Sequence, residues 1–370
     1  MPDENLHEPG GGRHRAHGVQ RRRTPRRKAL VATAWTAAAV VALGGAGLGY
    51  VYYKLNGNIS GVDIDAALGH HRPKNVDDGS MDILVLGSDS RAGANAKYGR
   101  DDSGSRSDTA MVVHVYKGHK KASVVSIPRD TLVTRPDCTT QSGKKVEGAR
   151  EQMFNSAYAN GGPACAVKTV ESMSGIRMDH VVEVDFTGFK KLVNTLGGVD
   201  ITTRQAIDDN QSHLHLTPGH HRLTGEQALG LVRTRHGVGD GSDLGRIQLQ
   251  QAFVKALIKQ VGQVGVFSDP KKLYDLASAA TNAVTTDSEL ASVKRLAGFA
   301  GGLKGIDAAH MSMVTLPVKY DAQDANRVLP QRAEDHQVWT ALKADRPIPA
   351  SATHDSGGAK GSAGKVVSGG

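Results

Sequence analysis

A stretch of 25 residues without a charged side chain, residues 29–53, constrains the fold more than any other feature of the sequence. A helix of that length spans about 37 Å, which exceeds the roughly 30 Å hydrocarbon core of a bilayer. Residues 21–28, directly before it, contain six Arg or Lys. By the positive-inside rule the N-terminus is then cytoplasmic and everything after residue 53 lies outside. We predict a cytoplasmic tail over residues 1–28 and a transmembrane helix over residues 29–53.

Three other interpretations compete with a membrane helix. A cleaved signal peptide would have a shorter apolar core, and a buried helix of a soluble domain is seldom so long and uncharged. The basic tail could also bind nucleic acid. We favour a topology signal that attracts anionic lipid, because the net charge of +9 is unevenly spread: residues 1–28 hold eight Arg or Lys and three Asp or Glu. No nucleic-acid partner is therefore expected.

Apolar runs of strand length alternate with helical patterns through the rest of the chain. The strand candidates are residues 82–87, 110–116, 122–127, 180–186, 199–203 and 312–316. The helical candidates are residues 163–174, residues 187–196, a helix opened by the capping box at Thr224, residues 245–263 and a helix capped by Thr286 with Glu289. The alternation predicts the α/β class, with helices packed on a central sheet.

Composition sets the expected limits of the folded domain. We predict a linker over residues 54–79 and a flexible Gly- and Ser-rich tail over residues 346–370. The domain between them spans residues 80–345. Its motif-bearing core covers about residues 81–260, and residues 261–345 form a C-terminal helical part whose role beyond completing the fold the sequence does not give.

Short charged motifs stand at the edges of the apolar elements. Guanidinium groups bind phosphate with paired hydrogen bonds and stay charged at every relevant pH. Arg246 and Gln250 are four residues apart near a helix start, so they share a face where an anion is favoured. Arg233 and Arg235 cannot share a helix face, so the helix must end near Leu231 if both bind one ligand. The arginines expected to surround a diphosphate are Arg106, Arg129, Arg233, Arg235 and Arg246.

Two aspartates at strand edges, Asp89 and Asp108, offer oxygen ligands that suit Mg²⁺. The alternative for each is a turn or N-cap residue, and we assign that role to Asp130, beside Arg129. The histidines lie in polar loops without a shared face, so we expect no metal there. The sequence has no Gly-x-Ser-x-Gly elbow, Walker A loop or His-Glu-x-x-His stretch.

Taken in order from about residue 81 to 255, these motifs resemble the LytR–CpsA–Psr family of cell-wall glycopolymer ligases. The segments that carry the resemblance are LVLGSDSR, RSDTAMVVHV, SIPRDTLV, FNSAYANGGP, VVEVDFTGFKKLVNTLGGVDI, LTGEQALGLVRTRH and DLGRIQLQQ. The resemblance implies an α/β/α sandwich around a central mixed sheet, with a deep apolar tunnel for a polyprenyl chain.

The resemblance also implies roles for individual residues. Asp89 and Asp108 resemble the family's ligands for Mg²⁺ (or Mn²⁺). Arg129, Arg235 and Asp243 would carry catalysis, with Asp243 as a base. Many members have a lysine where this chain has Met153, and its loss would weaken ligand binding unless Arg150 or another cation substitutes. The residues that resemble the pyrophosphate-binding set are Arg106, Arg129, Arg233, Arg235, Arg246 and Gln250.

We therefore expect a phosphotransferase that moves a glycopolymer from a polyprenyl-diphosphate carrier to peptidoglycan during cell-wall assembly, on the outer side of the membrane. One alternative is a hydrolase that uses water at the same site, which the sequence does not separate from a ligase. Another is a non-catalytic, membrane-bound regulator or lipid-carrier binder. The two cysteines, Cys138 and Cys165, are expected to form a disulfide in an exported domain, with two free buried thiols as the alternative.

Overall fold

The computed structural model describes residues 45–69, 71–88, 107–235, 242–263, 269–354 and 367–369. The chain divides into the unit Met1–Tyr52, of which residues 45–52 are described and helical, and the unit Tyr53–Gly370, which contains the folded domain. The predicted cytoplasmic tail and most of the predicted transmembrane stretch 29–53 lie outside the described residues. Within the described ranges, no helix combines the length and the apolar character needed to cross a bilayer.

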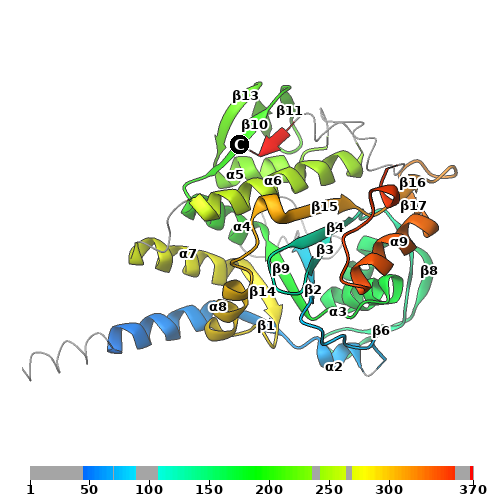
Figure 1. The fold of residues 1–370 in the computed structure, drawn as a ribbon, viewed down its shortest axis with the longest axis horizontal. Helices are drawn as coiled ribbons and strands as arrows, with labels where there is room; N and C mark the ends of the chain where they lie inside the picture. The colour runs from blue at the N-terminus through cyan, green and yellow to red at the C-terminus, as the bar shows by residue number, and fades with distance from the viewer. Residues whose placement is uncertain are drawn as a thin grey trace, which may run out of the picture. The chain divides into compact units, whose positions relative to one another are not determined.

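A seven-stranded mixed sheet forms the centre of the domain (Figure 1). Neighbouring strands run parallel in the pairs β1–β14, β2–β9 and β4–β15, and antiparallel in the other three pairs. Five of the six predicted strands lie in this sheet, within three residues of their expected bounds, which confirms the α/β class. The strand order is β1 (Ser60–Val62), β14 (Val284–Asp287), β9 (His180–Asp185), β2 (Met81–Ser88), β3 (Ser107–Val115), β4 (Ala122–Ile127) and β15 (Met311–Thr315).

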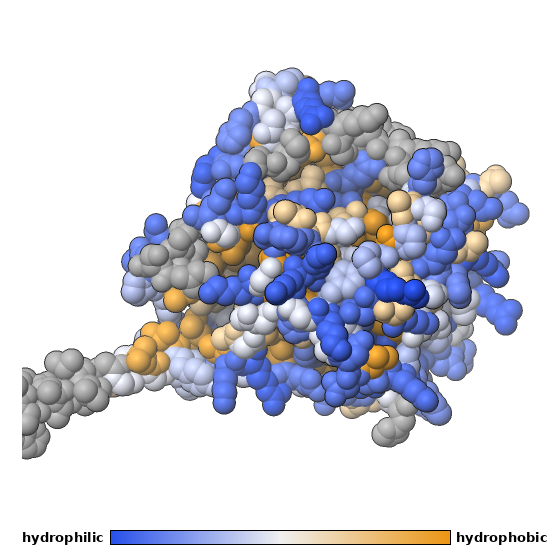
Figure 2. All heavy atoms as spheres, viewed as in Figure 1, coloured by the Kyte–Doolittle hydropathy of each residue, from blue (hydrophilic) through white to orange (hydrophobic). Residues whose placement is uncertain are grey.

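Helices cover both faces of this sheet (Figure 1). Side chains alternate between the two faces along each strand. Leu84 and Val112 point to one face and share a hydrophobic core with residues of α3 (Phe154–Ser174) and α9 (Arg332–Lys343). On the other face, Gln251 of α6 (Asp243–Gln263) donates a hydrogen bond to Ser126 Oγ of β4 at 3.0 Å. On the face of the molecule shown in Figure 2, hydrophilic side chains predominate, and apolar surface is visible in the hollows between them.

A second hydrophobic core lies between helices and a small separate sheet. It joins side chains of α4 (Phe186–Thr195), α5 (Gly225–Arg233) and α6 to those of β10 (Val199–Thr203). The predicted strand 199–203 is therefore a strand, but it lies outside the central sheet. It pairs antiparallel with β13 (Gly219–Leu223) and β18 (Val367–Gly369), beside the hairpin of β11 (Ile207–Asp209) and β12 (Leu214–Leu216).

The remaining elements are short or peripheral. Two hairpins, β5–β8 and β6–β7, connect β4 to α3, and a third, β16–β17, follows β15. The strands of these hairpins are β5 (Leu132–Arg135), β6 (Cys138–Thr139), β7 (Lys145–Val146), β8 (Ala149–Met153), β16 (Val318–Tyr320) and β17 (Val328–Pro330). The other helices are α2 (Asp65–Leu68), α7 (Pro270–Ala283), α8 (Val293–Gly302) and the 3₁₀ turns η3 (Ala308–His310) and η4 (Ala350–Ala352).

Local sequence signals determine several helix ends. Thr224 and Gln227 form the expected capping box of α5, each side chain bonding the other residue's backbone N–H. The predicted helix 163–174 is the second half of α3, which begins at Phe154 and kinks at Gly162 (φ 68°) before ending at Gly175. The prediction of a helix capped by Thr286 and Glu289 is wrong. Thr286 belongs to β14, and Ser292 caps the next helix, α8.

The predicted domain limits change at both ends. The segment predicted as a linker, residues 54–79, carries α2 and also β1, which pairs with β14 in the central sheet. Residues 261–345 are not only helical, since they supply β14 and β15 to that sheet. The predicted flexible tail contains η4 and β18, and Ala352 and Val367 are buried. These edge pairings join segments far apart in sequence, so composition alone gave no sign of them.

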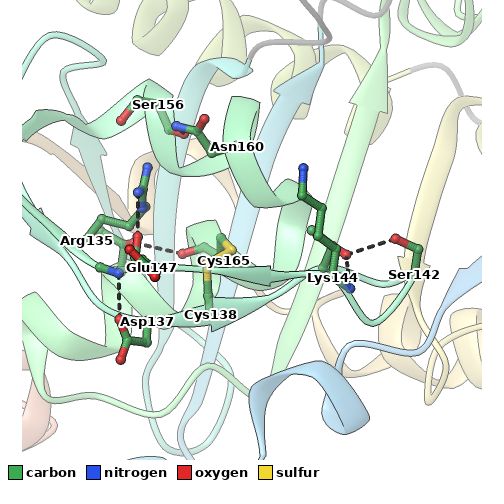
Figure 3. The surroundings of a disulfide bond; sticks show 12 residues. Arg135, Asp137, Cys138, Ser142, Lys144, Glu147, Ser156, Asn160 and Cys165 are labelled. Carbon is green, nitrogen blue, oxygen red and sulfur yellow. Dashed lines mark hydrogen bonds between the residues drawn. A yellow bond between two sulfur atoms is a disulfide. The ribbon is translucent and has the colours of Figure 1, made fainter.

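A disulfide ties the β6–β7 hairpin to α3 (Figure 3). The structure joins Cys138 to Cys165 with 5.5 Å between their Cα atoms. Gly161 packs against Cys165 Sγ, so a larger residue at that position would displace the bridge. The hairpin is further held by Arg135 Nη2, which donates to the Glu147 carbonyl at 2.7 Å (Figure 3). The expected pairing of the two cysteines is therefore geometrically satisfied.

Replacing both cysteines by serine is expected to lower the free energy of unfolding by about 3 kcal/mol, because the unfolded chain regains loop entropy. The bridged residues are 27 positions apart. Urea denaturation of the oxidised protein and of the double variant measures the difference. Labelling of the unreduced, denatured protein should find no free thiol, and two reactive thiols would contradict the pairing.

Candidate active site

Two adjoining cavities lie where β3, the loop after β4, the end of α5 and the start of α6 meet. We call the first the arginine chamber; its volume is about 280 Å³ and its polar lining includes Asp108, Thr109, Arg129, Asp209, Arg233, Arg235, Arg246 and Gln250. The second chamber has a volume of about 350 Å³ and is lined in part by Asp130, Asn155, Ser242, Asp243, Tyr320 and Asn326. Arg129 and Arg235 line both chambers. A larger cavity of about 1080 Å³, beside α9, contains none of the predicted site residues.

Arg129 is held in place through its backbone and its side chain. Its carbonyl accepts a hydrogen bond from Asn155 N at 3.1 Å, and its N–H donates to Asp243 Oδ2 at 3.2 Å. Its Nη1 donates to Asp108 Oδ1 at 2.7 Å. Burial lowers the pKa of the Arg129 guanidinium, but Asp108, Asp130 and Asp243 outweigh burial and raise that pKa above its ordinary value. The sequence thus places a fixed positive charge in the wall between the chambers.

Arg246 and Gln250 project from one face of α6, as their spacing predicted. Arg246 is 3% exposed, and its Nη2 donates to the Asp108 carbonyl at 2.9 Å. Gln250 Nε2 donates to Thr109 Oγ1 and to the Val232 carbonyl, both at 3.0 Å. Arg246 Nε is buried and has no hydrogen-bond partner within the described residues.

Arg233 and Arg235 reach the arginine chamber because α5 ends between them. The helix stops at Arg233, two residues later than expected, and Thr234 has a ψ of 132°. The Arg233 guanidinium lies 5.1 Å from the centre of the Phe186 ring. The Arg235 N–H donates to Asp209 Oδ2 at 3.0 Å. Burial and the charges of Arg246 and Arg129 lower the pKa of the Arg235 guanidinium, and the opposing effect of Asp243 and Asp108 is smaller.

Asp108 presents an ionised carboxylate to the arginine chamber. Burial raises the pKa of Asp108, but Arg246, Arg129 and Arg235 outweigh burial and hold it below its ordinary value. Its side chain is 27% exposed. Mg²⁺ typically takes one or two carboxylates and completes its shell with water and phosphate oxygens, so Asp108 fits the role of a ligand. The other expected ligand, Asp89, and the predicted phosphate ligand Arg106 lie outside the described residues.

Asp243 has the contacts of a residue that positions arginines. Besides accepting from Arg129 N, it forms an ion pair with Arg246, and its side chain is 9% exposed. Its expected role as a base receives no support from this geometry, because its carboxylate already interacts with the guanidinium groups of Arg129 and Arg246. Met153 lines the second chamber, whereas Arg150 is exposed on β8 and lines neither chamber, so Arg150 is not placed to supply the cation that the sequence offered as a substitute.

Several site residues carried no signal in the sequence. Asp209 is 2% exposed and orients the Arg235 backbone, but it belongs to the short hairpin β11–β12 that no motif marks. Tyr320 and Asn326 reach the second chamber from the β16–β17 hairpin. Asp130, assigned to a turn, also lines this chamber. Only the tertiary arrangement brings these residues to the predicted arginines.

The charges of the arginine chamber favour a dianion. Among the described residues that line it, four are arginines and two, Asp108 and Asp209, are carboxylates. A diphosphate diester is a dianion whose oxygens accept the paired hydrogen bonds that guanidinium groups donate. The described residues of the chamber therefore supply the donors and the excess positive charge that binding of a diphosphate requires.

Comparisons with known proteins identify relatives of this chain. The profile of the LytR_cpsA_psr family matches residues 51–344. The cell wall biosynthesis protein LcpA of Corynebacterium glutamicum is 31% identical over 299 residues, which are 74% of this chain and 57% of LcpA. The polyisoprenyl-teichoic acid–peptidoglycan teichoic acid transferase TagT of Bacillus subtilis is 35% identical over 244 residues, which are 62% of this chain and 70% of TagT.

A solved structure extends the likeness to three dimensions. TagT from B. subtilis, in its complex with LI-WTA, is 27% identical with a TM-score of 0.54, over 74% of this chain and 94% of that chain. This chain spans little more than half the length of LcpA. The ordered motifs, the mixed sheet and these matches establish that the chain belongs to the LytR_cpsA_psr family.

Proposed function

We propose that this protein is a phosphotransferase that joins a glycopolymer, carried on a polyprenyl diphosphate, to peptidoglycan. The observation that carries the proposal is the arginine chamber, in which Arg129, Arg233, Arg235 and Arg246 converge on one small cavity. TagT, which shares this fold, is named as a transferase from a polyisoprenyl carrier to peptidoglycan. The acceptor hydroxyl would attack the sugar-side phosphorus, and polyprenyl phosphate would leave.

The protein's own residues supply positioning and charge stabilisation, which are what phosphoryl transfer mainly needs. The guanidinium groups would hold the diphosphate and stabilise the negative charge that develops on the leaving phosphate. Because backbone hydrogen bonds fix the Arg129 segment before any ligand arrives, little reorganisation is required. We propose that Asp108, with Asp89, binds Mg²⁺ or Mn²⁺. Such an ion neutralises charge on phosphate oxygens.

The lipid portion of the donor needs an apolar surface near the arginine chamber. On the sheet face that α6 covers, Val85 lies opposite Met111 and beside Val182. Val85, Val182 and Val184 are only half-buried, although they lie on inner strands of a sheet with helices on both faces. An incompletely covered apolar face of this kind supports binding of a polyprenyl chain.

The proposed substrates require the domain to lie on the outer side of the membrane. We propose that residues 29–53 cross the membrane with the N-terminus in the cytoplasm, so that the domain meets the lipid carrier and peptidoglycan on the outer side. The basic residues before the apolar stretch support this orientation.

Transfer by the full-length protein in lipid vesicles tests the proposal. The donor would be a polyprenyl-diphosphate-linked oligosaccharide and the acceptor a peptidoglycan glycan oligomer, with Mg²⁺ present. We expect a joined product that is lost with EDTA and in Asp108→Ala. The product should be retained in Asp208→Ala, which changes an exposed aspartate that pairs with His215. Release of phosphorylated glycan without joined product would indicate a hydrolase. Arginine-dependent donor binding without turnover would indicate a lipid-carrier binder or regulator.

A further inference from the structure

Besides Arg235, which follows α5, four segments that are distant in sequence build the second chamber. The loop after β4 contributes Asp130, the start of α3 contributes Asn155, the start of α6 contributes Asp243, and the β16–β17 hairpin contributes Tyr320 and Asn326. Two backbone contacts hold the loop between its neighbours: Val328 N donates to the Asp130 carbonyl at 3.2 Å, and Phe154 N donates to the Thr131 carbonyl at 2.9 Å. The hairpin is thus fixed as a wall of this chamber.

The two chambers differ in charge. The arginine chamber has an excess of cations. In the second chamber the charged side chains among the described residues are the shared arginines, Arg129 and Arg235, and the carboxylates of Asp130 and Asp243, so their formal charges balance. A chamber whose formal charges balance does not attract a second phosphate electrostatically. It suits a neutral ligand that enters beside the diphosphate.

The remaining lining suits a sugar. Asn155 and Asn326 carry amides that both donate and accept hydrogen bonds, which matches the hydroxyl groups of a glycan. Tyr320 is 43% exposed and offers an aromatic surface to the apolar face of a sugar ring. A few polar groups beside apolar and aromatic surface are the usual composition of a small-molecule site.

Asp130 is the carboxylate of this chamber best placed to take a proton. Its side chain is 19% exposed, whereas that of Asp243 is 9% exposed and serves two arginines. Asp130 lies 3.3 Å from Arg129 Nε, while Arg129 Nη1 binds Asp108. One guanidinium therefore separates the base from the phosphate site. Burial raises the pKa of Asp130, aided by Asp243 and opposed by Arg129 and Arg246, and a raised pKa makes a carboxylate a stronger base.

We propose that the second chamber binds the acceptor, through the hydroxyl groups of an uncharged part of its glycan, and that Asp130 is the general base that removes the proton from its attacking hydroxyl. This inference rests on the proposed transferase activity. The acceptor oxygen forms a bond to the sugar-side phosphorus, and the bond from that phosphorus to the bridging diphosphate oxygen breaks. Polyprenyl phosphate leaves with the electron pair of that bond, and the hydroxyl proton passes to Asp130 and then to solvent.

The kinetic test uses the full-length protein in vesicles, with donor and acceptor varied separately. Asp130→Asn keeps the shape of the side chain and removes the base, so kcat should fall on the order of 10²-fold or more, while donor affinity stays within about twofold. The acid limb of the wild-type profile of kcat/KM against pH should be absent from the residual activity. Asp275→Asn, the same change at an exposed ion pair on α7, should match the wild type. Thermal denaturation shows whether each variant is folded.

A binding test separates this inference from the transferase activity. Binding of the peptidoglycan glycan oligomer alone, followed by NMR, should weaken several-fold in Asn326→Ala and Tyr320→Ala, with the donor unaffected. If the wild type makes no product but binds the glycan at these residues, the proposed function fails and the subsite remains. Wild-type turnover in a folded Asp130→Asn variant would overturn its role as base. Loss of donor binding in the hairpin variants would assign the chamber to the donor's own sugar and overturn the acceptor subsite.

Discussion

Replacing Arg129 by alanine is expected to lower the turnover of glycan transfer on the order of 10²-fold or more. Arg129 lines both chambers, and its guanidinium bonds Asp108 while its backbone bonds Asp243 and Asn155. The alanine variant removes a preorganised positive charge from the place where charge develops on the leaving phosphate. Initial rates with saturating donor and acceptor, measured in the vesicle assay, give the change in turnover.

Three further variants show whether the effect belongs to the site. Arg235→Ala should cause a loss of similar size, because Arg235 also lines both chambers. Arg129→Lys should remain impaired, since an ammonium group lacks the paired donors of guanidinium. Arg150→Ala removes an exposed arginine that lines neither chamber and should leave transfer unchanged. Wild-type turnover in both Arg129→Ala and Arg235→Ala would count against the proposed function.

Replacing Arg72 by alanine is expected to lower the free energy of unfolding by about 3–5 kcal/mol, since one charge of a buried pair would lose its partner. The Arg72 and Glu171 side chains are 6% and 3% exposed, and Arg72 Nη2 donates to Glu171 Oε1 at 2.6 Å. Arg72 also donates to the Met178 carbonyl at 2.7 Å. The pair thereby joins the segment before β2 to α3 and to the chain that follows α3. Urea denaturation of the wild type and the variant measures the loss.

An exposed ion pair provides the control for this stability experiment. Lys271 and Asp275 pair on the surface of α7, and Lys271→Ala should leave the urea midpoint unchanged within error. If Arg72→Ala were equally silent, the segment before β2 would not be part of the cooperative fold. Residues 54–79 would then behave as the linker that the sequence predicts.

Local patterns determined the elements of the fold and the identity of the arginine set. The apolar runs gave the central strands, because a buried strand needs apolar side chains wherever it packs. The Thr224 capping box and the i, i+2 spacing of Arg233 and Arg235 showed that α5 must stop near them. The i, i+4 spacing of Arg246 and Gln250 placed both on one face of α6, toward β3. Each of these inferences needs only neighbours a few residues apart.

The tertiary structure alone decided which distant segments meet. Short edge strands such as β1 and β18 are stabilised by their partners, β14 and β10, so their own sequences carry little signal. Likewise the second chamber exists only because the β16–β17 hairpin packs against the loop after β4. Burial and nearby charges then distinguish Asp130 from Asp243, and neither exists until the chain has folded. The sequence by itself determined the chemistry of the site, whereas long-range packing determined its shape and the role each carboxylate can take.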